Sequence, residues 1–147
     1  MHKAVWRSDL EVVQLLLVAH ADINSQNDDG ETPLISYASN ISGHCLNFFH
    51  SRGKGRNPRF EVFKLLLDAD ANLNAKDNRG RTALHALTSR PASRHMARGR
   101  FLAVRLLIES GVEINARDVE GKTALQSRLR RTDPDLAQFL RDSGAEE

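Results

Sequence analysis

Three segments of this sequence align with one another without a gap, and this internal repeat constrains the fold more than any other feature of the chain. Each segment runs through an apolar stretch to an Asn, then to a Gly six residues later, a Thr two residues after the Gly, and a Leu. The Asn positions lie 50 and 41 residues apart, so the spacing between segments varies while each segment stays fixed. The three segments are Glu11–Leu34, Glu61–Leu84 and Leu102–Leu125.

Each part of the repeated segment has a local structural meaning. Its apolar residues, such as those at positions 12–17, recur at helical spacing and predict the buried stripe of a helix. The sequences that end at Gly80 and Gly121 are typical of turns, in which glycine can adopt a positive φ. Thr82 and Thr123 precede short helical stretches, where a hydroxyl can cap the free N–H groups of the first turn. The segment therefore predicts a helix, a turn and the start of the next helix.

The repeated segment resembles the ankyrin repeat, a unit of about 33 residues made of a β-turn and two helices. The motifs that carry this resemblance best are Thr82-Ala83-Leu84-His85-Ala86-Leu87 and Thr32-Pro33-Leu34. The resemblance covers nearly the whole chain and implies an all-α solenoid of about four stacked units, forming a single domain over residues 1–147. The approximate units are residues 1–27, 28–76, 77–117 and 118–147.

The first of these units lacks its opening turn, and its two helices are expected at residues 2–8 and 10–18. Because the pattern begins part-way through a unit, our hypothesis is that the chain is a fragment of a longer array or that its first helix is an adapted cap. The resemblance implies that His85 ties neighbouring turns together by hydrogen bonds and is not a catalytic base. Asp133 and Asp135 flank a proline and indicate the N-terminal start of the last helix.

Two basic insertions separate the first and second helices of units two and three, at approximately residues 40–60 and 88–100. Together they carry a charge of +8, whereas the rest of the chain has 13 basic and 19 acidic residues, or −6. One hypothesis is a clamp for an anionic partner such as RNA, an acidic tail or a phosphorylated segment. The interpretation that we favour is a pair of solvated loops that offset an acidic frame. The basic residues are Arg52, Lys54, Arg56, Arg59, Arg90, Arg94, Arg98 and Arg100.

The resemblance implies a binding function, because the family's partner contacts usually come from the turn tips and the inner face of the first helix. We therefore expect a non-enzymatic scaffold that binds another protein, and a monomer located inside the cell, in the cytoplasm or nucleus. A regulatory segment of a larger protein is a further alternative. The expected tips change from acidic to basic to mixed along the stack, a gradient that a charged partner could recognise. They are Asp28, Asp29, Glu31, Asn78, Arg79, Arg81, Val119, Glu120 and Lys122, and the expected first-helix residues are Ser36, Ser39, Ala86, Ser89, Ser127 and Arg130.

No sequence feature points to catalysis, a cofactor or a metal. The sequence has no nucleophile elbow, phosphate-binding loop, dinucleotide-binding glycine motif or zinc-protease motif. His44, Cys45 and His50 would give a metal three ligands, whereas structural zinc normally takes four, so we interpret them as part of an apolar insert. The single cysteine excludes an internal disulfide, and the longest apolar run, Leu15–Ala19, is too short to span a membrane.

Overall fold

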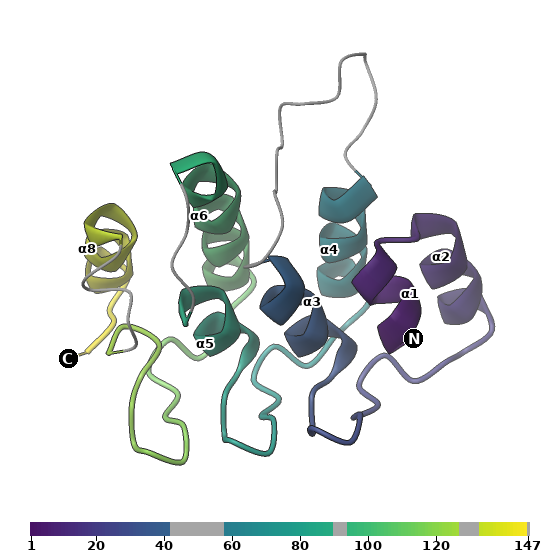
Figure 1. Cartoon of the computed structure of the whole chain (residues 1–147), viewed down its shortest axis with the longest axis horizontal. Helices are drawn as coiled ribbons and strands as arrows, with labels where there is room; N and C mark the ends of the chain where they lie inside the picture. The colour runs from purple at the N-terminus through teal and green to yellow at the C-terminus, as the bar shows by residue number, and fades with distance from the viewer. Residues whose placement is uncertain (42–57, 90–93, 127–132, 147) are drawn as a thin grey trace.

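The computed structural model describes residues 1–41, 58–89, 94–126 and 133–146, and the described side chains leave out residues 41 and 94–98. The described residues form seven helices and no strand. Figure 1 shows them in a row of helix pairs from the N-terminus to the C-terminus, with three turns projecting from the lower edge of the row. The helices are α1 (His2–Arg7), α2 (Leu10–Val18), α3 (Pro33–Ile41), α4 (Pro58–Asp68), α5 (Ala83–Thr88), α6 (Arg94–Glu109) and α8 (Pro134–Asp142).

The helices form two layers, one of first helices and one of second helices (Figure 1). The first helices α1, α3 and α5 pack against one another in that order, and the second helices α2 and α4 do the same. This arrangement is the all-α solenoid that the repeat predicts, and it confirms the expected fold class. The helices of the first unit also lie where the sequence predicts them, at His2–Arg7 and Leu10–Val18.

The core is built from the positions that recur in the repeated segment. The Leu that ends each segment is buried, and so are the apolar residues that face inward from the second helices. One stack of side chains therefore runs through all the units, since no unit could bury its apolar face alone. The buried core residues include Val13, Leu34, Val62, Phe63, Leu66, Leu84, Val104, Leu107, Leu125, Leu136 and Leu140.

Helix α2 exposes apolar side chains, one of them at a position that the inner units bury. Val62 and Ala103 occupy the position of Val12 in the next two units, and both are buried. Val12 is 40% exposed, and Leu15 and Val18 on the same helix are more exposed still. The outer end of the stack at α2 is therefore an apolar surface.

The turns are closed by an Asx residue and joined to one another by backbone hydrogen bonds. The Oδ1 atom of Asp77 accepts the N–H groups of Arg79 and Arg81, at 2.9 and 2.8 Å. Asn27 and Asp118 bind the same two positions of their own turns. Between turns, the Asn78 N–H donates to the Asp29 carbonyl and the Val119 N–H donates to the Arg79 carbonyl, each at 3.0 Å.

The recurrent Asn of the repeated segment joins each unit to the next one. The side-chain oxygen of Asn24 accepts the Asn72 N–H at 2.7 Å. Asn74 accepts the Glu113 N–H and Asn115 accepts the Glu146 N–H, both at 2.8 Å. The turn bonds and these Asn bonds together form a hydrogen-bond ladder that crosses every junction between units.

The recurrent glycines have a positive φ, and two of them also lie against the next turn. The φ angles are +73° at Gly30, +70° at Gly80 and +76° at Gly121. A Cβ atom at Gly80 would lie 2.9 Å from the backbone N of Val119, whereas a Cβ at Gly121 would meet nothing within 4 Å. Position 80 therefore requires glycine both for its backbone conformation and for its close contact with the next turn. Position 121 requires glycine for its backbone conformation alone.

This difference predicts unequal effects of two alanine substitutions. Gly121→Ala should lower the free energy of unfolding by about 1 kcal/mol, the cost of a left-handed backbone for an L-residue. Gly80→Ala should cost about 1 kcal/mol or more beyond that, because the new methyl group overpacks the junction with the Val119 turn. Urea unfolding of both variants measures the difference, and equal losses would contradict the role assigned to the ladder.

Tyr37 fixes the contact between α3 and α4. Its ring is buried and stacks on Phe63, with the ring centroids 5.6 Å apart and an angle of 14° between the planes. Its hydroxyl donates a hydrogen bond to the Arg59 carbonyl. Burial raises the pKa of Tyr37, and the charge of Arg59 opposes this rise in part.

The raised pKa predicts an alkaline limit to stability. Tyr37 supports the folded state at pH values below about 10, the pKa of an unfolded tyrosine, and this contribution is lost as the pH rises through the higher folded value. Because Tyr37 is the only tyrosine in the chain, phenolate absorbance reports it alone. The absorbance should rise at a higher pH in the native protein than in urea, and coincident titration curves would show that the hydroxyl is not buried.

Candidate functional site

Histidines hold two of the first helices against the turn of the following unit. The Nε2 atom of His85 donates to the Lys122 carbonyl at 3.1 Å, and its Nδ1 accepts the Thr82 N–H at 3.3 Å. His2 makes the matching contact, with Nε2 2.7 Å from the carbonyl oxygen of Glu31. The geometry agrees with the structural role expected for His85.

Sequence analysis missed the role of His2, although a signal was present. Glu31 and Lys122 each precede the Thr of their repeated segment, so the two histidines bind the same position of two different turns. His2 also lies 33 residues before Ile35, which occupies the histidine position of the second unit. Counting this interval would have identified His2 as the histidine of the first unit.

Most of the expected tip residues are exposed, as a binding role requires. Glu31 and Arg81 are half-buried, and the other seven tip residues are exposed. The ladder brings the tips of adjacent units together, because Asn78 also donates from its side-chain amide to the Asp28 carbonyl at 3.0 Å. The tips therefore form one continuous edge along the stack (Figure 1).

The charges of the tips are neutralised to different degrees. In the third unit Arg81 pairs with the buried Asp77 at 2.7 Å. In the fourth unit Lys122 pairs with Glu120 at 2.5 Å, and the hydrogen bond and charge of Glu120 raise the pKa of Lys122.

The second unit keeps its negative charge. Among the described residues, Asp28, Asp29 and Glu31 form no ion pair. The acidic part of the expected gradient is therefore its most fully charged part.

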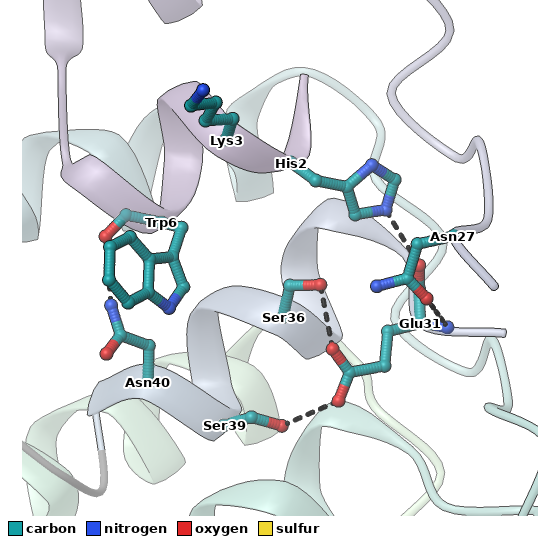
Figure 2. A pocket seen from close by; sticks show the side chains of 8 residues that line it. All are labelled: His2, Lys3, Trp6, Asn27, Glu31, Ser36, Ser39 and Asn40. Atoms are coloured by element: carbon teal, nitrogen blue, oxygen red, sulfur yellow. Dashed lines mark hydrogen bonds between the residues drawn. The ribbon is translucent and has the colours of Figure 1, made fainter. Parts of the chain in front are cut away.

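A groove of about 540 Å³ lies between α1 and α3, on the inner face of the first helices (Figure 2). The expected residues Ser36 and Ser39 line it, together with Lys3 and Trp6 of α1. Lys3 and Trp6 occupy the positions of Ser36 and Ser39 one unit earlier, again at an interval of 33 residues. The groove is lined by His2, Lys3, Trp6, Asn27, Glu31, Ser36, Ser39 and Asn40.

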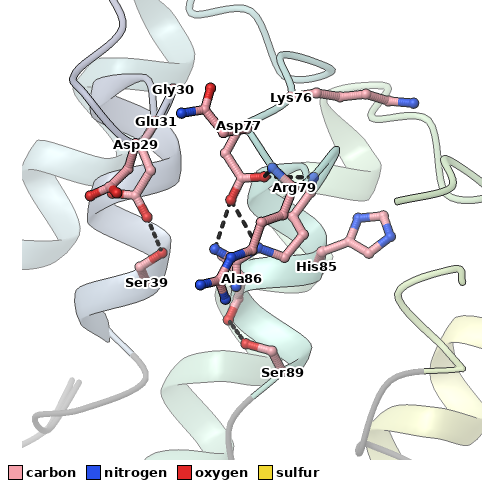
Figure 3. Close-up of polar contacts among 12 residues, drawn as sticks. Asp29, Gly30, Glu31, Ser39, Lys76, Asp77, Arg79, His85, Ala86 and Ser89 are labelled. Atoms are coloured by element: carbon pink, nitrogen blue, oxygen red, sulfur yellow. Dashed lines mark hydrogen bonds and ion pairs between the residues drawn. The ribbon is translucent and has the colours of Figure 1, made fainter. Parts of the chain in front are cut away.

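The inner face of the third unit is a poorer candidate for a binding site. Ala86 is buried, and the Ser89 hydroxyl donates to the Ala86 carbonyl at 3.1 Å, so this serine is satisfied within its own helix (Figure 3). Ser127 and Arg130 lie outside the described residues. The α1–α3 groove is therefore the part of the inner face on which a site can be built.

The expectation that residues 88–100 form a solvated basic loop is wrong for its second half. Helix α6 begins at Arg94, and Arg100 is buried, with only 2% of its surface exposed. Its guanidinium pairs with Asp133 at 2.5 Å, and Asp133 caps α8 by accepting the Leu136 N–H at 3.2 Å. The physical reason is that a cation at this point of α6 meets a capping carboxylate, so the pair can be buried together.

The other basic residues are less well defined by the structure. Arg59 lies in α4 and is half-buried. The remaining residues, Arg52, Lys54, Arg56 and Arg90, and the side chains of Arg94 and Arg98, lie outside the described part of the chain.

The expected start of the last helix is present, since Asp133 is its capping residue and Asp135 lies in its first turn. His44, Cys45 and His50 lie outside the described residues. In the described ranges, no group of three His, Cys, Asp or Glu residues is placed to hold a metal ion. In the same ranges, every helix is too short or too polar to cross a membrane.

The family follows from a comparison with known sequences. A family model described as ankyrin repeats (3 copies) matches residues 1–93 and again residues 54–147, which together span the whole chain. The chain belongs to the ankyrin repeat family. Ankyrin repeats are generally protein–protein interaction modules, and proteins of the family are typically non-enzymatic adaptors. A search among curated proteins finds no match to the chain.

The buried ion pair of this ankyrin-repeat chain predicts a sharp difference between two arginines of α6. Arg100→Met should lower the free energy of unfolding by about 3 kcal/mol, because it leaves the Asp133 carboxylate poorly solvated. Arg105→Met removes an exposed pair with Glu109 on the same helix and should cost less than about 0.5 kcal/mol. Chemical denaturation distinguishes the two, and a loss below about 1 kcal/mol for Arg100→Met would place this arginine in solvent after all.

Proposed function

We propose that this chain binds another protein through its turn tips and the inner face of its first helices, and that it catalyses no reaction. The observation that carries the proposal is Trp6, which is 59% exposed and lies in the groove between α1 and α3. Exposed tryptophans beside a groove are typical binding hot spots, since they contribute a large apolar area with few rotatable bonds.

The tips next to this groove support the same function. Glu31 belongs both to the groove and to a tip, and Asp28 and Asp29 precede it in the same turn. A partner that enters the groove therefore meets the charged edge at once. Charge of this kind speeds association and orients the partner more than it adds affinity.

The basic insertions supply the competing function, which is recognition of an anionic polymer. Arg100 is already paired with Asp133, so this function would depend on the other basic residues of the insertions. Binding to phosphates would weaken steeply as salt rises from about 50 to 200 mM, whereas a partner held in the groove should be less sensitive.

A capture experiment with two variants separates these functions. The groove variant carries Trp6→Ser and Glu31→Gln, at two residues that line the groove. The insertion variant carries Ser at 52, 54, 56, 90, 94 and 98. From a lysate, the groove variant should capture at least about tenfold less of the protein partner than the parent chain captures. The insertion variant should capture as much of it as the parent chain does. Thermal melts of both variants control for folding.

The opposite result would overturn the proposal. If the insertion variant loses capture, the groove variant keeps it, and nuclease abolishes capture by the parent chain, the chain binds nucleic acid through its insertions.

A further inference from the structure

Trp6 is held as a platform on one side of the α1–α3 groove. Its carbonyl oxygen accepts a hydrogen bond from the Asn40 side-chain amide at 2.9 Å, which ties this end of α1 to α3. Figure 2 shows the indole beside Asn40, on the groove side of α1. Because the faces of an indole ring carry partial negative charge, an exposed tryptophan attracts a cation from solution.

Glu31 places a carboxylate in the same groove, and its position is fixed by both backbone and side-chain contacts. Its N–H donates to Asn27 Oδ1 at 2.9 Å, and its carbonyl accepts from the Asn27 N–H and from His2. Its two carboxylate oxygens accept the hydroxyls of Ser36 and Ser39, at 2.9 and 3.2 Å (Figures 2 and 3). Each oxygen retains a further lone pair, so the carboxylate is pre-organised and can still accept from a ligand.

The charge of Glu31 is not compensated within its own turn. At the same position of the next unit, Arg81 pairs with Asp77, whereas the second unit has the neutral Asn27 in place of that aspartate. Lys3 lines the groove, but its side chain points away from Glu31 and Trp6 in Figure 2. Among the described residues, the groove therefore presents a fixed anion and an aromatic face with no cation between them.

From this juxtaposition we propose that the α1–α3 groove binds one arginine side chain from an extended segment of the partner protein. The inference rests on the proposed binding function of the inner face. The guanidinium would stack on Trp6 and donate to the Glu31 carboxylate, and Asn40 lines the same groove. A planar guanidinium with five donors suits this combination better than the compact ammonium of lysine.

Lys3 at the rim of the groove limits the sequence of the partner segment. A run of basic residues would bring further cations to the Lys3 ammonium, and like charges repel at this range. The Lys3 side of the groove therefore disfavours a second cation, so the groove accommodates a single arginine.

The test uses the full chain and pools of short blocked peptides in which only the central residue is fixed, as Arg, Lys, Leu or Glu, and the flanks contain no basic residue. Arg pools should be retained at least about tenfold better than Leu or Glu pools and better than Lys pools. Anisotropy of a labelled Arg peptide then gives the affinities of variants.

Two substitutions test the two sides of the groove. Glu31→Gln and Trp6→Leu should each weaken binding of the Arg peptide by about tenfold, while Trp6→Phe should restore part of the loss. The matched control is Glu11→Gln, which removes an exposed carboxylate on α2 outside the groove and should leave binding unchanged. Thermal melts confirm that each variant folds.

Several outcomes would overturn the arginine inference. The first is that the chain retains Arg pools no better than Leu pools. The second is that binding of the Arg peptide survives both Glu31→Gln and Trp6→Leu. The third is that a polyarginine peptide binds more tightly in proportion to its charge. If another pool binds and Trp6→Leu abolishes its binding, the arginine inference fails while the function of the inner face stands. If no pool binds, the arginine inference fails and partner capture alone decides the proposed function.

Discussion

The structure depends on the hydrogen bonds that pass from each unit to the next. Asn24, Asn74 and Asn115 each accept a backbone N–H from the following unit, and the turn tips exchange backbone bonds beside them. These bonds satisfy backbone groups that the loops would otherwise leave to water, and they fix the distance at which the helix layers pack. The buried leucines of successive units can therefore stack as one core.

This ladder also explains how a fixed segment can tolerate an irregular spacing. The accepting Asn residues and the turn bonds of the ladder all lie within the repeated segment. In the sequence, the extra residues lie between the first and second helices of a unit, outside the repeated segment. Long connections of this kind cost little free energy, because the entropy of closing a loop grows slowly with its length.

Sequence reasoning could predict the features that depend on short intervals. The two helices of the first unit and the cap at Asp133 follow from residues within a few positions of one another, and the role of His85 follows from the family resemblance. Arg100 could not be placed in this way, because its partner Asp133 is brought to it only by the stacking of α6 and α8. Its charge suggested a solvated loop, and only the tertiary structure shows that it is neutralised.

Only some of the residues that line the groove could be predicted from the sequence. Ser36 and Ser39 are expected on the inner face, whereas Trp6 is not among the expected residues, because the first unit lacks the turn that marks the register. The interval of 33 residues from His2 to Ile35 equals one repeat and sets the register of the first unit. What no interval could show is the position of the Glu31 carboxylate, which is fixed by hydroxyls from the helix that follows it.

The α1–α3 groove crosses the seam between the first and second units, so its two walls belong to different modules of the array. Units of a linear array contact only their neighbours, so a junction between two units can open locally without unfolding the rest. A partner segment that contacts both walls binds only while this junction is closed, and by mass action it disfavours the open form. Recognition and the integrity of this junction are thus linked thermodynamically, without any change in shape.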